Sequence, residues 1–507
     1  MAELSYTLPL DNIQGNILAG FHKDFESHLF LEFTTQQEAR IWLNSIVNEI
    51  ATSEEVKQFN DLFKTLRKRS GREGTVKATW TNIAFTHSGL EALGISGSEL
   101  ETFPDAFKLG MKERAEIIGD LEANSPDHWI KPFGTKNIHA LLMVASDSQV
   151  DLHEMVMRYT HDLYAYPSIN IVFVQEGKSR REEPGHEHFG FRDGVSQPGV
   201  RGFTKPNNPE NPNQGNPGQD LLHAGEFIVG YPTQLPFAKE GHDGPNPDEG
   251  EVSQSGPTWT KDGSYLVFRR LQQNVPAFKN FVKETAKKLG ISEELMGAKM
   301  VGRYRSGAPL ERTEDQPKDF DPTLKDPSID DPSILKDDKI NHFEFGEDEE
   351  GKIVPRAAHI RKTYPRDQDG NDTESHTQTR RMLRRGITYG NSYKPQTGIF
   401  SKEGEARYPY DRGLLFLAYQ SDIERQFEFV QQFWVNNAQF PQSGDGEDPI
   451  IAQSKEGPFS LPVCKPSLTA ASGCPVQNVS IKHFVTTTGG EYFFQPSISA
   501  LKMLAGE

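Results

Sequence analysis

Cysteine is scarce in this sequence, which holds only Cys464 and Cys474 among 507 residues. Two cysteines cannot form a disulfide framework for a chain of this length, nor a cysteine-based zinc or iron–sulfur site. The chain also lacks a Cys-x-x-Cys-His motif, so a covalently attached c-type haem is excluded.

Long apolar runs are missing as well. No run approaches the roughly 18 residues that a membrane-spanning helix needs. The first residues, Met-Ala-Glu-Leu-Ser-Tyr-Thr, lack the basic and apolar regions of a secretory signal. We therefore expect no membrane association and a cytoplasmic location, and a secreted protein whose leader has been removed stays open as the alternative.

Positive charge is in deficit, with 55 Lys and Arg against 72 Asp and Glu and a net charge of -17. Binding along a nucleic-acid backbone requires a basic face, so we expect no nucleic-acid partner. A local basic pocket remains possible. The length allows roughly two to four domains.

The first third of the chain alternates between strand and helix patterns in the order βαββαβ, which is the order of a ferredoxin-like unit. The predicted strands cover 28–34, 77–86, 137–145 and 168–175, and the predicted helices 36–50, 88–93 and 150–163. The stretch 177–263 is rich in Pro, Gly, Asn, Asp and His and is predicted to be a long loop segment.

A second cycle follows this loop. Its predicted strands are 264–271, 382–389, 413–420 and 491–494, its helices are 276–289 and 422–436, and an acidic, Pro-rich loop covers 311–350. We predict an α+β protein of two packed ferredoxin-like domains with antiparallel sheets and large loop insertions. The expected boundaries are 1–176, 177–263 for the loop segment, and 264–507.

The segment Gly190-Phe-Arg-Asp-Gly194 lies within the long loop. Its glycines allow a tight turn that brings the short Asp193 carboxylate close to a ligand. A plain Asp-Gly surface turn is the alternative. His186 and His188 lie nearby, but their spacing lacks the i, i+4 pattern of a helical zinc site and gives only a weak metal signal.

A single histidine, His359, stands between small residues and a basic cluster formed by Arg361, Lys362 and Arg366. Small neighbours let a large group approach the imidazole, and the cations suit its anionic substituents. A non-covalent haem has these needs, an axial imidazole and partners for its propionates. A solvated or core histidine beside a basic surface is the alternative.

Arg384 and Arg385 lie together in a β-like segment, so they must point to opposite faces of the strand. One of them can face inward, where it needs an anionic partner. A solvated charge cluster is the alternative.

Three motifs in this order resemble the dye-decolorizing peroxidase family. They are Gly-Phe-Arg-Asp-Gly at 190–194, Ala-Ala-His at 357–359 and Arg-Arg-Gly-Ile-Thr-Tyr-Gly at 384–390. Segments 11–20, 83–94 and 490–501 extend the resemblance over essentially the whole chain, and the large insertions resemble its longer branch, which includes fungal enzymes. The resemblance implies two ferredoxin-like domains with non-covalent haem b in the second. Thr388 and Tyr304 depart from the family pattern, where proline and tryptophan are common.

The same resemblance implies roles for individual residues. His359 would be the proximal iron ligand, Asp193 the distal acid/base and Arg384 the distal arginine. Asp448 would accept a hydrogen bond from the other nitrogen of His359. Apolar residues expected to line the distal pocket are Leu415 and Phe416.

The implied function is a haem b peroxidase that reduces hydrogen peroxide and oxidises dyes, phenolics or other bulky aromatic donors. A carboxylate base such as Asp193 stays ionised below neutral pH, so we expect activity in acid. A haem carrier or transfer protein without peroxide turnover is the main alternative. A chlorite-dismutase-like enzyme and a metal-dependent hydrolase using His186, His188 and Asp193 are the others, and the sequence does not predict an oligomeric state.

Bulky dyes cannot reach a buried haem, so their electrons would pass through aromatic side chains. Tyr389, five residues after Arg384, is one candidate relay. Trp434 is the other, although Ile423, Phe427 and Val430 share its helical stripe and indicate core packing as the alternative.

Overall fold

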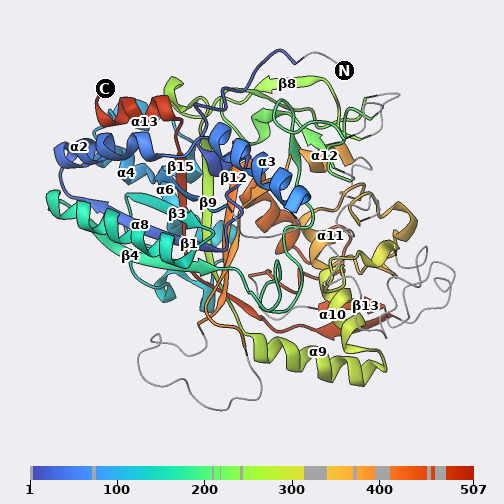
Figure 1. Cartoon of the computed structure of the whole chain (residues 1–507). Coiled ribbons are helices and arrows are strands. Elements are labelled where there is room, and N and C mark those ends of the chain that lie inside the picture. Colours follow the sequence, from blue (N-terminus) through green and yellow to red (C-terminus); the bar gives the residue numbers. More distant parts are fainter. Residues whose placement is uncertain are drawn as a thin grey trace.

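The centre of the molecule is a nine-stranded sheet whose neighbouring strands all pair antiparallel. Figure 1 shows helices on two sides of it. On one side lie α2 (Gln36–Ile46), α8 (Gln149–Asp162) and α13 (Ile498–Ala505), and on another lie α9 (Val275–Leu289), α10 (Glu293–Val301) and α11 (His359–Thr363). The computed structural model describes residues 4–70, 76–207, 211–216, 218–239, 244–312, 340–368, 374–393, 411–453, 458–462 and 476–507.

The first half of the sheet contains strands in the spatial order β2-β3-β1-β4, the order of a ferredoxin-like unit. The strands are β1 (Phe25–Phe33), β2 (Thr79–Phe85), β3 (Ala140–Ser146) and β4 (Ile169–Lys178). The helices include α2 (Gln36–Ile46), α4 (His87–Ala92) and α8 (Gln149–Asp162), all predicted, and α3 (Ser53–Ser70), which was not predicted.

The second half repeats the same order, with β10 and β11 next to β12, followed by β9 and β15. The strands are β9 (Ser264–Gln273), β10 (Leu383–Arg384), β11 (Ile387–Tyr389), β12 (Gly413–Gln420) and β15 (Val485–Gln495). The helices α9 (Val275–Leu289) and α10 (Glu293–Val301) follow β9. The predicted α+β class with two ferredoxin-like units is therefore confirmed, and the domain boundaries stay a prediction.

The two halves meet at both edges of their sheets. Phe494 of β15 pairs with Phe85 of β2. At the opposite edge Thr388 of β11 donates from Oγ1 to the carbonyl oxygen of Lys178 in β4 at 2.6 Å. The fourth strand of each half thus contacts the second strand of the other, which closes the sheet into a barrel. Thr388, one of the two departures from the resemblance noted above, supplies the hydroxyl for this contact.

Three predicted segments differ from the structure. The predicted strand 382–389 is interrupted at Gly386, where a Cβ would lie 2.8 Å from the carbonyl oxygen of Leu415. The predicted helix 422–436 consists of two π-helical segments, η11 (Glu424–Glu428) and η12 (Val430–Val435). The predicted acidic loop 311–350 lies largely outside the described residues.

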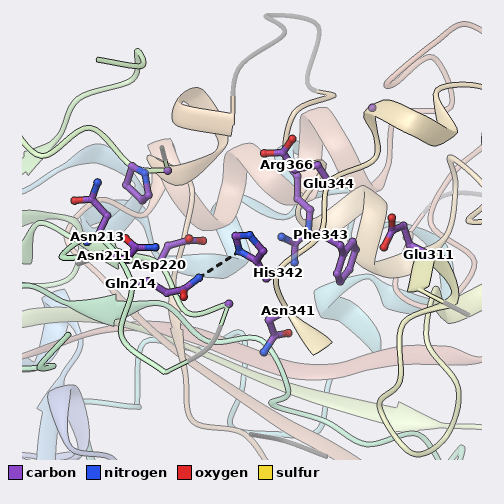
Figure 2. Close-up of a pocket in the computed structure, with 14 residues that line it drawn as sticks. Asn211, Asn213, Gln214, Asp220, Glu311, Asn341, His342, Phe343, Glu344 and Arg366 are labelled. Carbon is purple, nitrogen blue, oxygen red and sulfur yellow. Dashed lines mark hydrogen bonds between the residues drawn. The ribbon is translucent and has the colours of Figure 1, made fainter. Parts of the chain in front are cut away.

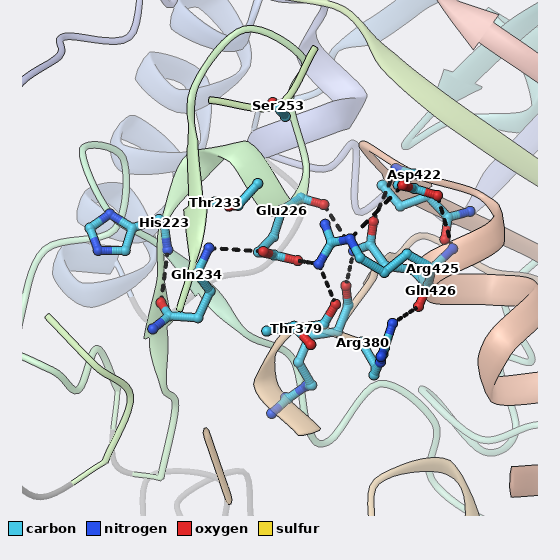
Figure 3. A network of polar contacts seen from close by, with 12 residues as sticks. His223, Glu226, Thr233, Gln234, Ser253, Thr379, Arg380, Asp422, Arg425 and Gln426 are labelled. Carbon is cyan, nitrogen blue, oxygen red and sulfur yellow. Dashed lines mark hydrogen bonds and ion pairs between the residues drawn. The ribbon is translucent and has the colours of Figure 1, made fainter. Parts of the chain in front are cut away.

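The described part of the predicted loop segment 177–263 contains short strands and turns. They are β5 (Gly199–Val200), β6 (Leu221–Leu222), β7 (Pro232–Gln234), β8 (Glu249–Val252) and the 3-10 turns η5 (Ala224–Glu226) and η6 (Thr258–Thr260). Figure 3 shows how Glu226 anchors this segment to η11: its buried carboxylate accepts hydrogen bonds from Arg425 and from the backbone of Gln234, both at 2.8 Å. The segment is therefore bound to the second half by a buried ion pair. No helix in the described residues has the length and apolarity needed to cross a bilayer.

Candidate active site

His359 is the first residue of the short helix α11 (His359–Thr363). Its Nδ1 lies 2.8 Å from Oδ2 of Asp448, and no described residue hydrogen-bonds to its Nε2. The side chain lies deep within the fold but keeps 26% of its surface accessible. Because Asp448 binds Nδ1 and part of the side chain is accessible, Nε2 is the atom available to a ligand.

Asp448 is held rigidly beside His359. Its side chain is fully buried, and its Oδ1 accepts hydrogen bonds from the backbone of Ile450 at 2.7 Å and Ile451 at 3.0 Å, which leaves Oδ2 for the imidazole. Burial lowers the pKa of His359, but the charge and hydrogen bond of Asp448 outweigh this and raise that pKa above its ordinary value. The pair keeps the imidazole in one orientation, with Nδ1–H toward the carboxylate.

Asp193 lies on the loop between β4 and β5, flanked by Gly190 and Gly194 with φ of 98° and 72°. These left-handed conformations favour glycine and make the turn that presents the carboxylate. The Asp193 backbone donates to the carbonyl of Gly185 at 3.0 Å, so the turn is fixed at its base. Its Oδ1 accepts from the Gly194 backbone at 2.7 Å and from Nη1 of Arg384 at 3.1 Å.

Arg384 ends strand β10, where it pairs with Ala418 of β12. Its Nη2 donates to the carbonyl of Ser196 at 2.8 Å, and its backbone exchanges two hydrogen bonds with the amide of Gln197. Arg385 points the other way and donates to the carbonyls of Asn16, Ile17 and Leu18, each at 3.0 Å. The opposite orientation of the two arginines is as the strand pattern predicted.

The charges of Arg384 and Asp193 both act on the His359 imidazole, so the two groups lie near it. Arg384 and Asp193 themselves keep 33% and 35% of their side-chain surface accessible. The structure therefore gathers His359, Asp448, Asp193 and Arg384, from four distant parts of the chain, around one site.

Of the two apolar residues expected to line the pocket, Phe416 lies on the face of the site and Leu415 does not. Because neighbours on a strand point to opposite faces, only Phe416 lies on the face of Ala418 and Arg384. Leu415 is fully buried in the hydrophobic core on the other face, and this corrects the expectation that both residues line the pocket. Leu414, two residues before Phe416 and only half-buried, shares the site's face. Strand alternation is the signal that identifies it.

The two candidate relay residues are both buried. Tyr389 pairs with Gly413 and lies on the Leu415 face of the sheet, away from Arg384, with the Arg270 guanidinium 4.2 Å from its ring centroid. Trp434 stacks on Phe440 at 5.6 Å in the core, as the apolar stripe indicated. Neither side chain can contact a bulky donor directly.

Arg361 and Lys362, which follow His359 on helix α11, are bound by other groups of the fold. Arg361 is completely buried and binds Asp348 and the carbonyl of Val354. Lys362 donates to the carbonyls of Asn437 and Phe440. These residues fix α11 in place, which corrects the expectation that they serve an anionic ligand.

Arg366, the third cation, lines a polar pocket of about 400 Å³. Figure 2 shows it there together with Asp220, His342 and Phe343. Burial, followed by the charges of Arg366 and Arg384, lowers the pKa of Arg303 to about 9, so each of these two arginines lies near Arg303. The buried Arg303 and Arg366 thus lie next to the site that contains Arg384.

The two loop histidines are not arranged as metal ligands. The ring nitrogens of His186 lie 3.0 and 3.1 Å from the carbonyls of Pro184 and Arg305, and Nε2 of His188 lies 2.8 Å from the carbonyl of Tyr389. Within the described ranges no group of three or more potential ligands could hold a metal ion. These histidines therefore brace the loop that carries Asp193.

Comparison with known protein families agrees with this arrangement. Residues 12–181 match the DyP dimeric alpha+beta barrel domain, and residues 240–442 match the C-terminal domain of Dyp-type peroxidases. The chain belongs to the Dyp-type peroxidase family. The assignment to this family rests on a match to both halves of the barrel and not on any single residue of the site.

Similar proteins are found among fungi. Peroxidase 2 from Mycetinis scorodonius is 33% identical over 99% of this chain and 88% of its own length. Dye-decolorizing peroxidase AauDyP1 from Auricularia auricula-judae is 31% identical over 98% of this chain and 87% of its own. A solved variant of the Pleurotus ostreatus dye-decolorizing peroxidase superposes with a TM-score of 0.77 at 31% identity, covering 99% of this chain and 100% of that one.

Proposed function

We propose that this chain is a haem b peroxidase that reduces hydrogen peroxide and oxidises dyes, phenolics and other aromatic donors. The arrangement of His359, backed by Asp448, near the Asp193–Arg384 pair carries the proposal. A family member that is 28% identical to this chain has been solved in complex with 2,6-dimethoxyphenol, which supports phenolic donors.

The described residues fit a non-covalent haem. Nε2 of His359 is available as an axial ligand, Phe416 and Leu414 offer apolar surface on the same face as Arg384, and Arg366 is a buried cation suited to a propionate. When bound, haem supplies the iron centre that takes oxidising equivalents from peroxide and delivers them to donors.

Asp193 and Arg384 have complementary roles in this proposal. The Asp193 carboxylate accepts a proton from peroxide and returns it to the leaving oxygen. The Arg384 guanidinium donates hydrogen bonds to the oxygen on which negative charge develops. Their mutual hydrogen bond of 3.1 Å, with Ser196 and the Gly194 backbone as further partners, keeps both groups oriented before peroxide arrives.

Asp448 acts through His359. By accepting the Nδ1 proton in a hydrogen bond it raises the basicity of the imidazole, which stabilises iron in higher oxidation states. Tyr389 and Trp434 are proposed relays, and because both are buried they would pass electrons from a more exposed position. A cytoplasmic location remains a prediction.

A haem carrier is the main rival, and it would need His359 without an acid–arginine pair aimed at the same site. The pair is present at hydrogen-bonding distance, and this observation favours turnover of peroxide. No comparable observation favours the carrier.

The direct test is the absorption spectrum of the protein titrated with haemin and then treated with one equivalent of hydrogen peroxide. We expect a Soret band that shifts with peroxide and is lost in His359→Ala. His161→Ala, which removes an exposed histidine of α8, is the matched control and should keep the band. A band indifferent to peroxide would indicate a carrier, and a band that persists in His359→Ala would refute the assigned ligand.

A further inference from the structure

Asp193 lies at the open end of a short hairpin formed by residues 185–193, and Glu187 lies near its closed end. At the open end the Asp193 backbone donates to the carbonyl of Gly185 at 3.0 Å. Nearer the turn the Glu187 backbone donates to the carbonyl of Phe191, also at 3.0 Å. The shape of this hairpin therefore determines where the Asp193 carboxylate lies.

The side chain of Glu187 accepts hydrogen bonds from the closed end of the same hairpin. Its Oε1 accepts from the backbone of Phe191 at 2.8 Å, and its Oε2 accepts from the backbone of Phe189 at 2.7 Å. Oε2 also accepts from Nε2 of Gln273 at 2.5 Å. All three partners are donors, so only the ionised carboxylate, which offers acceptor sites alone, matches them.

Gln273 connects this carboxylate to the sheet that carries Arg384. It is the last residue of β9, which pairs with β12, and β12 pairs with β10, the strand that ends at Arg384. Through Gln273, Glu187 joins the hairpin of Asp193 to the sheet of Arg384. The two halves of the Asp193–Arg384 pair thus have a second connection, besides their own hydrogen bond.

Aromatic packing fixes the other side of the hairpin. The rings of Phe189 and Phe191 lie 4.2 and 6.3 Å from the ring of the buried Phe278 on α9, measured between centroids. The two backbone groups that Glu187 binds therefore belong to residues whose side chains are already packed in the core. A carboxylate that accepts from both can fix the turn between them.

The electrostatics of Glu187 are unfavourable apart from these contacts. Removal from water raises its pKa, the hydrogen bonds from Gln273, Phe189 and Phe191 lower it, and the nearby charge of Asp193 raises it again. A second anion close to Asp193 costs free energy, so its presence there calls for an explanation. The three donors are what the ionised side chain gains in return.

We propose that Glu187 is a positioning residue whose carboxylate joins the hairpin to β9 and thereby holds Asp193 in place against Arg384 for proton transfer from peroxide. This inference rests on the proposed haem peroxidase function. Proton transfer requires the base to lie within hydrogen-bonding reach of the proton, so a small displacement of Asp193 lowers the rate strongly. If Glu187 only stabilised the loop, its replacement would lower stability without acting through Asp193.

Glu226 is a matched control within the same segment 177–263. Its carboxylate also accepts from a backbone group, that of Gln234, and from a side chain, that of Arg425, both at 2.8 Å. Burial raises its pKa as well. Because Glu226 anchors the turn η5 and not the hairpin, Glu226→Gln removes the same kind of contact away from Asp193.

The experiment compares haem-loaded Glu187→Gln and Glu226→Gln, each made in the parent and in an Asp193→Asn background. The readouts are the stopped-flow rate constant with peroxide and the hydrogen exchange of segment 185–194, followed by mass spectrometry. We expect Glu187→Gln to lower the rate constant by about 10- to 100-fold and to speed exchange in this segment, and Glu226→Gln to do neither. In the Asp193→Asn background the effect of Glu187→Gln on the rate should largely disappear, because the base that it positions is gone.

Two outcomes would overturn the proposal. A rate loss of the same size in the Asp193→Asn background would mean that Glu187 does not act through Asp193. A parent-like rate in Glu187→Gln would mean that Asp193 is held without it. The subsequent reaction with 2,6-dimethoxyphenol should keep the parent's rate, because Asp193 serves the peroxide step.

Gln273→Met is a second variant that keeps the proposal testable if Glu187→Gln takes up no haem. It removes one of the three donors and leaves the two backbone groups on the carboxylate. We expect a smaller loss of the peroxide rate than in Glu187→Gln, again dependent on Asp193. A parent-like rate in Gln273→Met would refute the connection through β9.

Failure of this inference is distinguishable from failure of the proposed function. If the parent takes up no haem or does not react with peroxide, the peroxidase proposal fails first. If the parent reacts with peroxide and Asp193→Asn is slow while Glu187→Gln reacts at the parent's rate, only the role of Glu187 is refuted.

Discussion

The carboxylate of Asp193 accepts a hydrogen bond of 3.1 Å from the guanidinium of Arg384, although the two residues are 191 positions apart in the chain. Asp193 is presented by a glycine-flanked turn and Arg384 by the end of a strand, so each is fixed by its own local structure. In the proposed mechanism the acid that moves a proton and the cation that stabilises the departing oxygen thus share one hydrogen bond. The contribution of each residue to the rate with peroxide can be measured by its own substitution.

Replacing Asp193 by Asn keeps the size of the side chain and its ability to accept from Arg384 but removes the base. We expect the rate with peroxide to fall by about 10²- to 10⁴-fold, the usual contribution of a positioned acid/base. Stopped-flow spectra of the haem-loaded variant would measure it, with the Soret band of the resting protein unchanged. Asp127→Asn, at an exposed position of the first half, is the control. An unaltered peroxide rate in Asp193→Asn would show that the base lies elsewhere.

Arg384 and Arg385 should give opposite results on truncation to alanine. Arg384→Ala removes the donor aimed at the site, so we expect the peroxide rate to fall by about 10²- to 10³-fold with little change in stability. Arg385→Ala leaves the carbonyls of Asn16, Ile17 and Leu18 without their donor and should cost on the order of 2 kcal/mol of unfolding free energy. Stopped-flow kinetics and urea denaturation of both variants measure the two effects. If Arg385→Ala slowed the peroxide step as much as Arg384→Ala, the assignment of faces would be wrong.

Glu491 should make the protein less stable as the pH rises from about 4.5 to 7. Burial raises the pKa of this carboxyl to about 7, even though the backbone of Met111 and Tyr492 donates to it. Over this range the folded state keeps a proton that the unfolded state has lost, so the unfolding free energy decreases with pH. The full effect is about 3 kcal/mol.

Urea denaturation at several pH values would check this, with Glu491→Gln expected to remove most of that decrease. Glu113→Gln, at an exposed position on helix α6 (Asp105–Glu113), is the control and should retain the parent's pH dependence. Equal pH slopes for the parent and Glu491→Gln would contradict the prediction.

The strands were predictable because their alternation and apolar runs are local properties of the sequence. The paired ferredoxin-like order followed from them, and the opposite orientation of Arg384 and Arg385 followed from the pleat. The same alternation, applied to the strand 413–420, places Phe416 and Leu414 on the face of the site and Leu415 on the opposite face. The resemblance had placed Leu415 in the pocket against this rule.

What could not be predicted depends on contacts between distant segments. A basic residue beside His359 can serve a ligand or a buried partner, and only the fold shows that Arg361 binds Asp348. Likewise the pairing of His359 with Asp448 was expected from the resemblance alone, because nothing local to either residue points to the other. The interruption at Gly386 arises from the closeness of β12, which is also a tertiary effect.

Electron transfer from bulky donors is expected to depend on Tyr389. Oxidation of a tyrosine releases its phenolic proton, and the Asp411 carboxylate lies near the Tyr389 hydroxyl to accept it. We expect Tyr389→Phe to lower the rate with a large dye while the peroxide step and the oxidation of 2,6-dimethoxyphenol stay at parent levels. Trp434→Phe, tested in the same way, decides whether that buried indole is also a relay or only core packing.

Tyr265→Phe, which removes another fully buried tyrosine hydroxyl, is the matched control for this comparison. Electron paramagnetic resonance after peroxide addition should show a tyrosyl signal that is lost in Tyr389→Phe and kept in Tyr265→Phe. A parent-like dye rate and an unchanged radical signal in Tyr389→Phe would remove Tyr389 from the route. Because Tyr389 lies on the opposite face of β11 from the site, that result would direct the search for the electron route to the face of the sheet that carries Arg384.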